Sequence, residues 1–300
     1  MDKKEYRNKK HILKGKYRED KRAIKGAYKD ARADLRKIYK EYDEEPEEEK
    51  EEKVPLDKKS REYKEYMAAL NVEKRKENHL PFYTHGEEIM NMVTHIVGGG
   101  TGIIGLAVGF VFAMLKHPEE PLVAISMLVF TITMILLYTV SAVYHGLHVN
   151  KGKKVFQIID HCTIYLLIAG TYTPICTLGL ASISPWNYVL LGIVWALCIF
   201  GIVINATMMK KMWVKVISMI LYIATGWAII FFYPVLVQSM TISGMWLFIG
   251  GGISYTVGSI LYGIGSKKRY FHSIFHLFVN LGTLLQYLAI LLYLVINIQA

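Results

Sequence analysis

Seven long apolar runs follow one another along the second part of the chain, separated by short polar stretches. Each run is close to the roughly 20 residues that an α-helix needs to cross the hydrocarbon core of a membrane. The runs lie near 89–115, 121–144, 157–180, 186–207, 213–234, 243–263 and 272–297. This pattern predicts an all-α fold, with residues 81–300 forming a seven-transmembrane helix bundle in a multi-pass protein of the cell membrane.

The first 80 residues differ from this pattern because they are highly charged. They hold 25 of the 35 Lys and Arg residues and 20 of the 25 Asp and Glu residues. The mean hydropathy of +0.27 is therefore an average over two unlike parts. We expect a charged helical N-terminal extension before the membrane domain, in which residues 43–80 form an acidic linker and a short helical segment.

An 11-residue repeat predicts that residues 1–42 form a basic amphipathic helix. Its aromatic positions are Tyr6, Tyr17, Tyr28 and Tyr39, and an aliphatic residue follows seven positions after each of the first three. Eleven residues return a helix to within about 20° of the same direction, so these side chains form one stripe. Such a stripe among basic residues is typical of a helix on an anionic lipid surface. It suits a solvated helix or a coiled-coil seam equally well.

The charges between the apolar runs indicate how the helices are oriented. Basic residues occupy the N-terminal extension and every second loop, at Lys151, Lys153, Lys154, Lys210, Lys211, Lys215, Lys267, Lys268 and Arg269. The alternate loops contain only Lys116. Because loops rich in Lys and Arg tend to stay on the cytoplasmic side, we expect a cytoplasmic N-terminus and a C-terminus outside.

The cysteines and the N-terminus argue against a disulfide-stabilised protein and against a cleavable signal. Cys162, Cys176 and Cys198 all lie within apolar runs and lack a CxxC spacing, so we expect packing residues rather than disulfides or a thiolate metal site. The chain is charged from its second residue, so we expect no cleavable signal and targeting by the first transmembrane segment. Membrane lipid is the expected partner, and no nucleic acid is expected to bind.

The few polar residues of the apolar runs gather at the cytoplasmic ends of four of them. The set consists of Glu88, Asn91 and His95 in the first run, Ser141 and His145 in the second, Asp160 in the third, and His272 and His276 in the last. Asp160 is the only carboxylate side chain after Glu120. An ionisable group within an apolar helix is costly unless it is paired, so this layer is the candidate functional site.

Three histidines of the layer have the spacing of metal ligands. His272 and His276 are four residues apart on one helix face, so one ion can bind both imidazoles. His145 would supply a third ligand and leave a fourth tetrahedral position for water, which is the pattern of catalytic zinc sites. The expected cofactor is therefore Zn²⁺.

The remaining polar residues of the layer have predicted roles around this ion. Asp160 can orient the water and accept its proton, or it can hold a ligating imidazole through a hydrogen bond. His95, together with Glu88 and Asn91, is expected to support the ligands through hydrogen bonds. A fourth ligand is the alternative role for His95.

Three ordered motifs resemble those of the haemolysin III family, the bacterial branch of the progestin and adipoQ receptor family, with the alkaline ceramidases as more distant relatives. They are ExxNxxTH from Glu88 to His95, SxxxH from Ser141 to His145 with the following Asp160, and HxxxH from His272 to His276. The likeness covers about residues 83–298. It implies a seven-helix bundle with an intramembrane zinc near the cytoplasmic face. In that case the three motif histidines are the ligands, Asp160 acts on the zinc-bound water, and Ser141 lies beside it.

The function favoured by these residues is that of a zinc-dependent hydrolase of a lipid amide or ester. Asp160 would accept a proton, and Ser141 would donate a hydrogen bond to the developing oxyanion. The alternative is a haemolysin-type cytolytic or lipid-responsive receptor-like membrane protein without catalysis. A channel or metal transporter is disfavoured because the outer halves of the helices offer few polar residues. We expect the metal to bind without help from residues 1–80.

Overall fold

The computed structural model describes residues 26, 33, 71–209, 211–265 and 268–297. The chain divides into two units, Met1–Lys64 and Glu65–Ala300, and nearly all of the described residues belong to the second. The basic helix expected at residues 1–42 and most of the linker expected at residues 43–80 lie outside the described residues.

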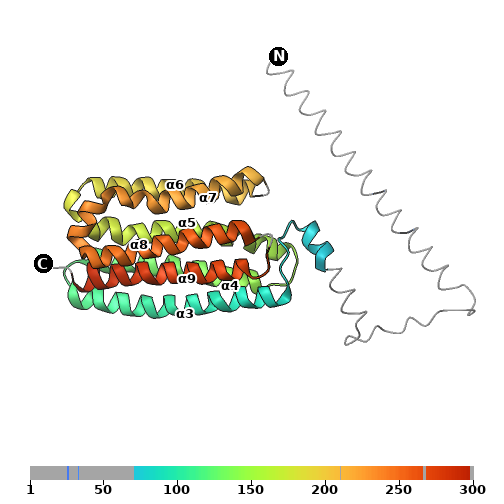
Figure 1. Ribbon diagram of the computed structural model, residues 1–300, viewed down its shortest axis with the longest axis horizontal. Helices are drawn as coiled ribbons and strands as arrows, with labels where there is room; N and C mark the ends of the chain where they lie inside the picture. The colour runs from blue at the N-terminus through green and yellow to red at the C-terminus, as the bar shows by residue number, and fades with distance from the viewer. Residues whose placement is uncertain (1–25, 27–32, 34–70, 210, 266–267, 298–300) are drawn as a thin grey trace, which may run out of the picture. The chain divides into compact units, whose positions relative to one another are not determined.

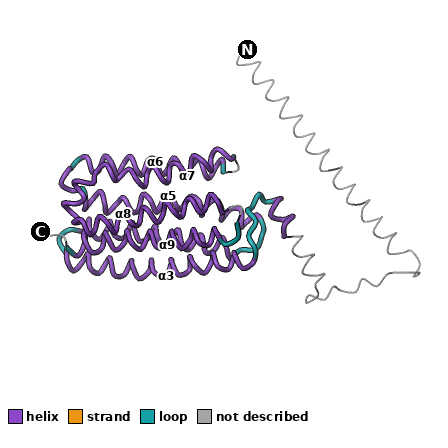
Figure 2. The backbone as a smooth tube through the Cα atoms, in the orientation of Figure 1, coloured by secondary structure: helices purple, strands orange, loops and turns teal. Residues whose placement is uncertain are grey.

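The described part of the chain is helical and contains no β-strand (Figure 2). Its long helices are α3 (His85–Lys116), α4 (Pro121–Gly146), α5 (Lys151–Pro174), α6 (Trp186–Met208), α7 (Met212–Trp227), α8 (Tyr233–Gly265) and α9 (Phe271–Ile290). Short π- or 3₁₀-helical segments are η1 (Ile175–Gly179), η2 (Ala181–Ile183), η3 (Ala228–Phe232) and η4 (Leu291–Ile296). The predicted all-α fold is confirmed for these residues.

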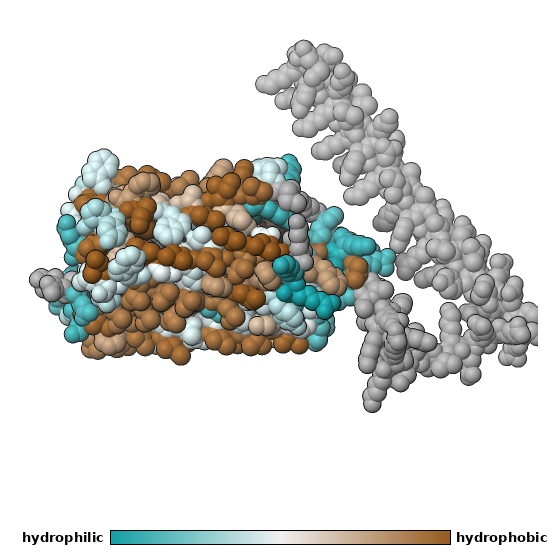
Figure 3. All heavy atoms as spheres, in the orientation of Figure 1, coloured by the Kyte–Doolittle hydropathy of each residue, from teal (hydrophilic) through white to brown (hydrophobic). Residues whose placement is uncertain are grey.

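The helices run lengthwise beside one another and expose apolar side chains along their flanks. Figure 1 shows α6 and α7 along one edge, α5 and α8 between, and α3, α4 and α9 along the other. In Figure 3 the hydrophobic side chains cover the flanks and the hydrophilic ones gather at the two ends. Six described segments are long and apolar enough to cross a membrane. The structure thus has the features of a multi-pass membrane protein.

The longest of these segments is Trp213–Ile264, which has 52 residues. A straight helix of this length would measure about 78 Å, whereas the hydrocarbon core is about 30 Å thick. Thr241 interrupts it with φ 61° and ψ 168°, and Figure 1 shows α7 and the later part of α8 as two separate rods. The two runs predicted at 213–234 and 243–263 lie on either side of this break.

A row of glycines lets α3 approach its neighbours closely. Gly98, Gly102, Gly105 and Gly109 are all buried. A β-carbon at these positions would meet side chains of α4 or α9, including the Tyr138 ring beside Gly98 and the Tyr287 ring beside Gly105. This is the packing that small residues provide between transmembrane helices.

We expect Gly98→Ala to destabilise the protein while Gly100→Ala does not. A β-carbon at Gly98 would lie 2.5 Å from Asn280 Oδ1 and 2.7 Å from a Tyr138 ring carbon, whereas one at Gly100 meets nothing within 4 Å. Overpacking of this kind costs about 1–3 kcal/mol. Thermal unfolding of the detergent-solubilised variants measures the difference, and equal midpoints would contradict the close contact at Gly98.

The basic stretch before the third run is helical rather than a loop. The sequence placed Lys151, Lys153 and Lys154 between two spans, but α5 begins at Lys151. Asn150 caps this helix by accepting a hydrogen bond from the Lys153 amide at 2.9 Å. The side chain of Lys153 is 1% exposed. One of the lysines used to assign the orientation is therefore part of the protein interior.

Pro174 ends the α-helical part of α5. The chain continues as a π-helical turn, η1, up to Gly179. Proline has no amide hydrogen to donate and its ring crowds the preceding turn, so the regular bonding pattern changes at this point. The helix nevertheless continues far enough to complete the third apolar segment.

Candidate metal centre

Three buried histidines from two helices converge at one end of the bundle. His145 lies in the last turn of α4, while His272 and His276 lie in the first two turns of α9. One nitrogen from each ring falls within 4.8 Å of the other two, and the Nε2 atoms of His272 and His276 are 3.1 Å apart. The structure brings together the three residues that the sequence indicated as metal ligands.

In two of these rings, Nδ1 has a hydrogen-bond partner outside the triad. His145 donates from Nδ1 to Glu88 Oε2 at 2.7 Å, and its buried Nε2 has no partner among the described residues. His276 donates from Nδ1 to the Asn91 carbonyl at 3.2 Å. Hydrogen bonds of this kind fix the tautomer of a metal-binding imidazole and leave the opposite nitrogen for the ion.

The cluster has dimensions that fit a tetrahedral zinc ion. Bonds of 2.0–2.1 Å place two ligand nitrogens about 3.3 Å apart, close to the 3.1 Å between the Nε2 atoms of His272 and His276. The ligand nitrogens of the cluster all lie within 4.8 Å of one another, a limit about 1.5 Å above this tetrahedral value. The three histidines can therefore hold a metal ion.

Glu88 is the centre of a buried network of charged side chains that holds His145. Its Oε1 accepts a hydrogen bond from Arg75 at 2.7 Å and lies 3.0 Å from the Lys153 amine. Its Oε2 accepts from His145. All four side chains are buried. Because buried ions are stable only when their charges are paired, Glu88 ties together the segment before α3, the end of α4 and the first turn of α5.

The start of α3 is fixed by a capping box that also reaches the start of α9. The Thr84 side chain accepts from the Glu87 amide, and the Glu87 carboxylate accepts back from the Thr84 amide at 2.8 Å. The other oxygen of Glu87 accepts from the Tyr270 amide, also at 2.8 Å. One turn further, Asn91 accepts a hydrogen bond from Ser273 at 2.5 Å. These contacts hold α3 against the helix that carries two of the three histidines.

His95 contacts the site by ring stacking. Its imidazole is nearly parallel to that of His276, with 3.6 Å between the ring centroids, and it meets the edge of Tyr138 at 5.1 Å. Neither buried nitrogen of His95 has a hydrogen-bond partner in the described part of the chain. His95 was expected to make a hydrogen bond, but its contact with His276 is ring stacking. Glu88 does accept a hydrogen bond from His145, and the Asn91 carbonyl accepts one from His276.

Ser141 and Asp160 lie close to each other on the neighbouring helices α4 and α5. Ser141 is buried one turn before His145, and its hydroxyl makes no hydrogen bond of regular geometry with the described residues. The Asp160 carboxyl lies beside that hydroxyl and keeps 14% of its side chain exposed. His161 lies apart from the triad, with Nε2 3.3 Å from the Tyr262 hydroxyl.

Tyr83, just before α3, covers two of the histidines. Its ring stacks on His272 with 4.9 Å between centroids and lies 5.8 Å from His145. Burial raises the pKa of the Tyr83 hydroxyl well above its usual range, and the nearby Tyr262 and Glu88 raise it further. The phenol therefore keeps its proton at neutral pH.

Sequence reasoning missed four residues that build the site: Arg75, Tyr83, Lys153 and Ser273. Arg75 and Lys153 were grouped with surface charges because lysine and arginine are rarely buried. Ser273 lies within the HxxxH motif, so its place next to a ligand was a usable signal. Ring stacking has no characteristic spacing in a sequence, so nothing marked Tyr83.

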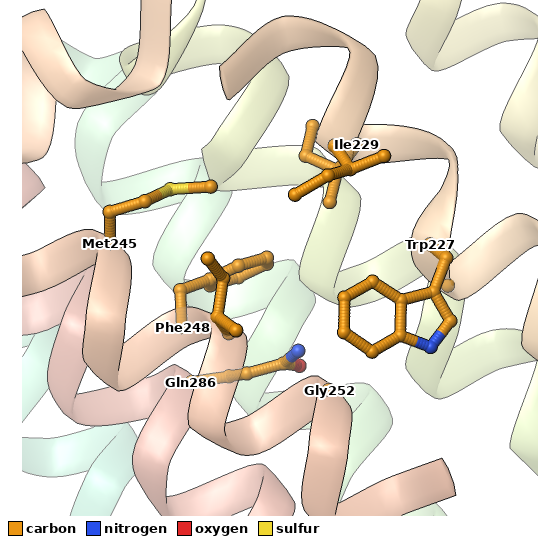
Figure 4. A pocket seen from close by; sticks show the side chains of 9 residues that line it. Trp227, Ile229, Met245, Phe248, Gly252 and Gln286 are labelled. Carbon is orange, nitrogen blue, oxygen red and sulfur yellow. The ribbon is translucent and has the colours of Figure 1, made fainter. Parts of the chain in front are cut away.

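A separate small cavity lies between α7, η3, α8 and α9. Trp227, Ile229, Met245, Phe248 and Gln286 are among the residues that line it (Figure 4). Its volume of about 10 Å³ leaves room for roughly one water molecule. The cavity is therefore too small to be a substrate site, and none of the three histidines lines it.

We expect Glu88→Gln to lower the stability of the protein strongly. The amide keeps the shape of the side chain but leaves the buried charges of Arg75 and Lys153 without their carboxylate partner. Breaking a buried ion pair in this way costs about 3–5 kcal/mol. Thermal or denaturant unfolding measures the loss. Glu120→Gln is the control, because that side chain is 70% exposed and should change stability by less than about 0.5 kcal/mol.

Fold and site together define a class, that of a multi-pass helical membrane protein with a buried histidine triad able to hold a metal ion. A sequence model described as haemolysin-III related matches residues 83–287. The chain belongs to this haemolysin-III-related family and is a multi-pass protein of the cell membrane, as its three motifs and apolar runs predicted.

Individual relatives agree with this assignment. The chain is 37% identical over 207 residues to Hemolysin-3 of Bacillus cereus, covering 69% of this chain and 91% of the relative. It is 36% identical over 211 residues to a Hemolysin-3 homolog of Bacillus subtilis (strain 168), covering 70% and 96%. It is also 27% identical over 165 residues to the human monocyte to macrophage differentiation factor, covering 53% and 66%.

Proposed function

We propose that this protein is a zinc-dependent hydrolase of a lipid amide or ester. The observation that carries the proposal is the convergence of the three histidines with their support: His145 is held by Glu88 and presents an unpartnered Nε2 to the cluster. Three histidine ligands leave one tetrahedral position open, which distinguishes catalytic from structural zinc sites. The proposed arrangement of the chain is seven spans with the N-terminus in the cytoplasm and the C-terminus outside.

A zinc ion in this site would supply Lewis-acid activation of water and of the scissile carbonyl. The protein contributes two polar groups. Asp160 accepts the proton that water loses on attack and passes it to the leaving amine or alcohol. Ser141 has a buried hydroxyl beside Asp160 that can donate to the carbonyl oxygen as negative charge develops there. The stacked rings of Tyr83 and His272 cover the cluster and limit the access of bulk water.

The substrate is proposed to enter sideways from the bilayer. Around the triad, His145 and His276 are almost completely buried. Asp160 and His161 keep 14% and 20% of their side chains exposed. These residues of α5 lie next to Tyr262 of α8, so the opening is expected between these two helices. A lipid carbonyl at that depth would meet Asp160 first.

The second candidate function is a haemolysin-type cytolytic or lipid-responsive receptor-like role without catalysis. The name Hemolysin-3 of the Bacillus cereus relative favours it. In this case the metal would hold the ends of α4 and α9 together, and binding of lipid would change their packing. The two candidates differ in turnover, since only the first one releases a fatty acid from its lipid.

The N-terminal extension is proposed to lie on an anionic lipid surface. Its 16 Lys and Arg residues up to Tyr42, against seven acidic ones, accompany the tyrosine stripe of the 11-residue repeat. Each basic residue near such a surface contributes about 1 kcal/mol. The test is whether the extension of the purified protein binds vesicles that contain phosphatidylserine and whether added salt releases it. Release by salt would favour the lipid surface over a coiled-coil contact.

The function is tested on the purified wild-type protein in detergent or lipid nanodiscs. Elemental analysis should find about one zinc per chain, and incubation with ceramide-type amides and with lipid esters should release fatty acid. A strong chelator should remove the metal and the activity together. Zinc without turnover on either class would favour the non-catalytic candidate, and protein without zinc would refute the metal site.

A further inference from the structure

Arg75 reaches the metal site from outside the region that defines the family. It lies in a helical stretch at residues 71–77, ahead of the family match at 83–287. Its residue is only 4% exposed, although the neighbours Lys74 and Lys76 are exposed. A buried guanidinium is rare because its desolvation is costly. The burial of Arg75 therefore needs compensating interactions, which identify what the residue does in the structure.

The guanidinium makes two hydrogen bonds at once. One amino group donates to Glu88 Oε1 at 2.7 Å, and the other donates to the Pro81 carbonyl at 2.6 Å. The first bond acts on the carboxylate whose opposite oxygen holds His145 Nδ1. The second holds the chain two residues before Tyr83, whose ring stacks on His272. Arg75 thus bears on two of the three histidines without touching either.

We infer that Arg75 is a positioning residue for the metal site: by holding Glu88 and the chain at Pro81, it sets His145 and the covering ring of Tyr83. The inference rests on the proposed function, because it assumes that the triad binds zinc. It assigns to the segment before α3 a part in building the site. Zinc binding is then not independent of residues 1–80, contrary to the expectation from the sequence.

Two effects of Arg75, its positive charge and its positioning of Glu88, predict opposite changes in zinc affinity when the arginine is removed. The arginine is a cation close to a site for a divalent cation, so its removal would strengthen zinc binding if net charge were decisive. If positioning is decisive, Glu88 loses one of its fixed partners and His145 is held less firmly, so zinc binding weakens. Loss of a partner of this kind typically weakens metal affinity by about 10–100-fold.

The test measures the zinc dissociation constant of full-length variants by competition with a chelator of known affinity. We expect Arg75→Met to weaken binding by about 10–100-fold. Arg75→Lys keeps the charge but not the two-pronged donor geometry, so its affinity should lie between those of Arg75→Met and the wild type. Lys76→Met removes the same charge from an exposed neighbouring residue and should bind zinc as the wild type does.

Two further measurements make each outcome decisive. In a Glu88→Gln background, Arg75→Met should cause a smaller additional loss of affinity than in the wild type, because only the route through Pro81 and Tyr83 is left to break. If Arg75→Met does not fold, the comparison of Arg75→Lys with the wild type replaces it. Unchanged or tighter zinc binding in the folded Arg75 variants would overturn the inference while leaving the proposed function intact. Wild-type protein that binds no zinc would overturn both.

Discussion

Asp160→Asn should leave about one zinc per chain and reduce lipid hydrolysis by a factor of about 10²–10⁴, the usual contribution of a general base. The amide has nearly the same shape as the carboxylate but cannot accept the proton that water gives up. Asp160 lies beside Ser141 and is not one of the three histidines grouped as possible metal ligands. Its loss should therefore separate turnover from metal binding.

The measurement combines elemental analysis with the initial rate of fatty-acid release. Glu119→Gln is the matched control, because it makes the same change from carboxylate to amide on an exposed loop and should retain the full rate. Loss of zinc from Asp160→Asn would instead make Asp160 part of the support for the metal. Full activity of Asp160→Asn would remove it from the mechanism.

Replacing both His272 and His276 with alanine should lower the zinc content from about one ion per chain to less than about 0.1. The two Nε2 atoms are 3.1 Å apart, so one tetrahedral ion takes both nitrogens. A single remaining imidazole at His145 binds zinc too weakly to retain it through purification. Hydrolysis should disappear together with the metal.

The double variant His85→Ala with His148→Ala serves as its control, because both of these histidines are exposed and neither belongs to the triad. It removes the same number of imidazoles and should keep the zinc. The two proteins also need comparable thermal stability, so that the absence of metal is not a consequence of unfolding. Zinc retained by the His272 and His276 double variant would place the metal elsewhere in the chain.

The positions of the helices could be predicted because the membrane imposes one length on every span. The apolar run at 186–207 became α6 almost residue for residue, and the run at 121–144 became α4. The break at Thr241 was harder to locate. A loop was expected between 234 and 243, but the chain stays helical up to the neighbourhood of one residue with positive φ. Threonine gives no signal for such a conformation, which glycine adopts most easily.

The sequence predicted those site residues that are polar within an apolar stretch of the chain. Histidines within apolar runs stand out, and the spacing of His272 and His276 on one helix face identifies them as a pair. Arg75 does not stand out, since it lies among other charged residues and its burial depends on a contact with Glu88 across the fold. His95 shows a different limit, because hydrogen bonding and stacking are equally compatible with its place in the motif.

The uneven distribution of ionisable groups has a consequence for the movement of protons. Beyond the histidine layer, the stretches 96–115, 121–144, 162–209, 216–264 and 277–297 contain no acidic, basic or histidine side chain. At the layer itself, Glu88 and Lys153 are in direct contact and Asp160 is partly exposed. In the proposed hydrolysis, a released proton would therefore find acidic, basic or histidine side chains towards one face of the membrane only. Catalysis should follow the acidity of that compartment and be insensitive to the acidity of the other.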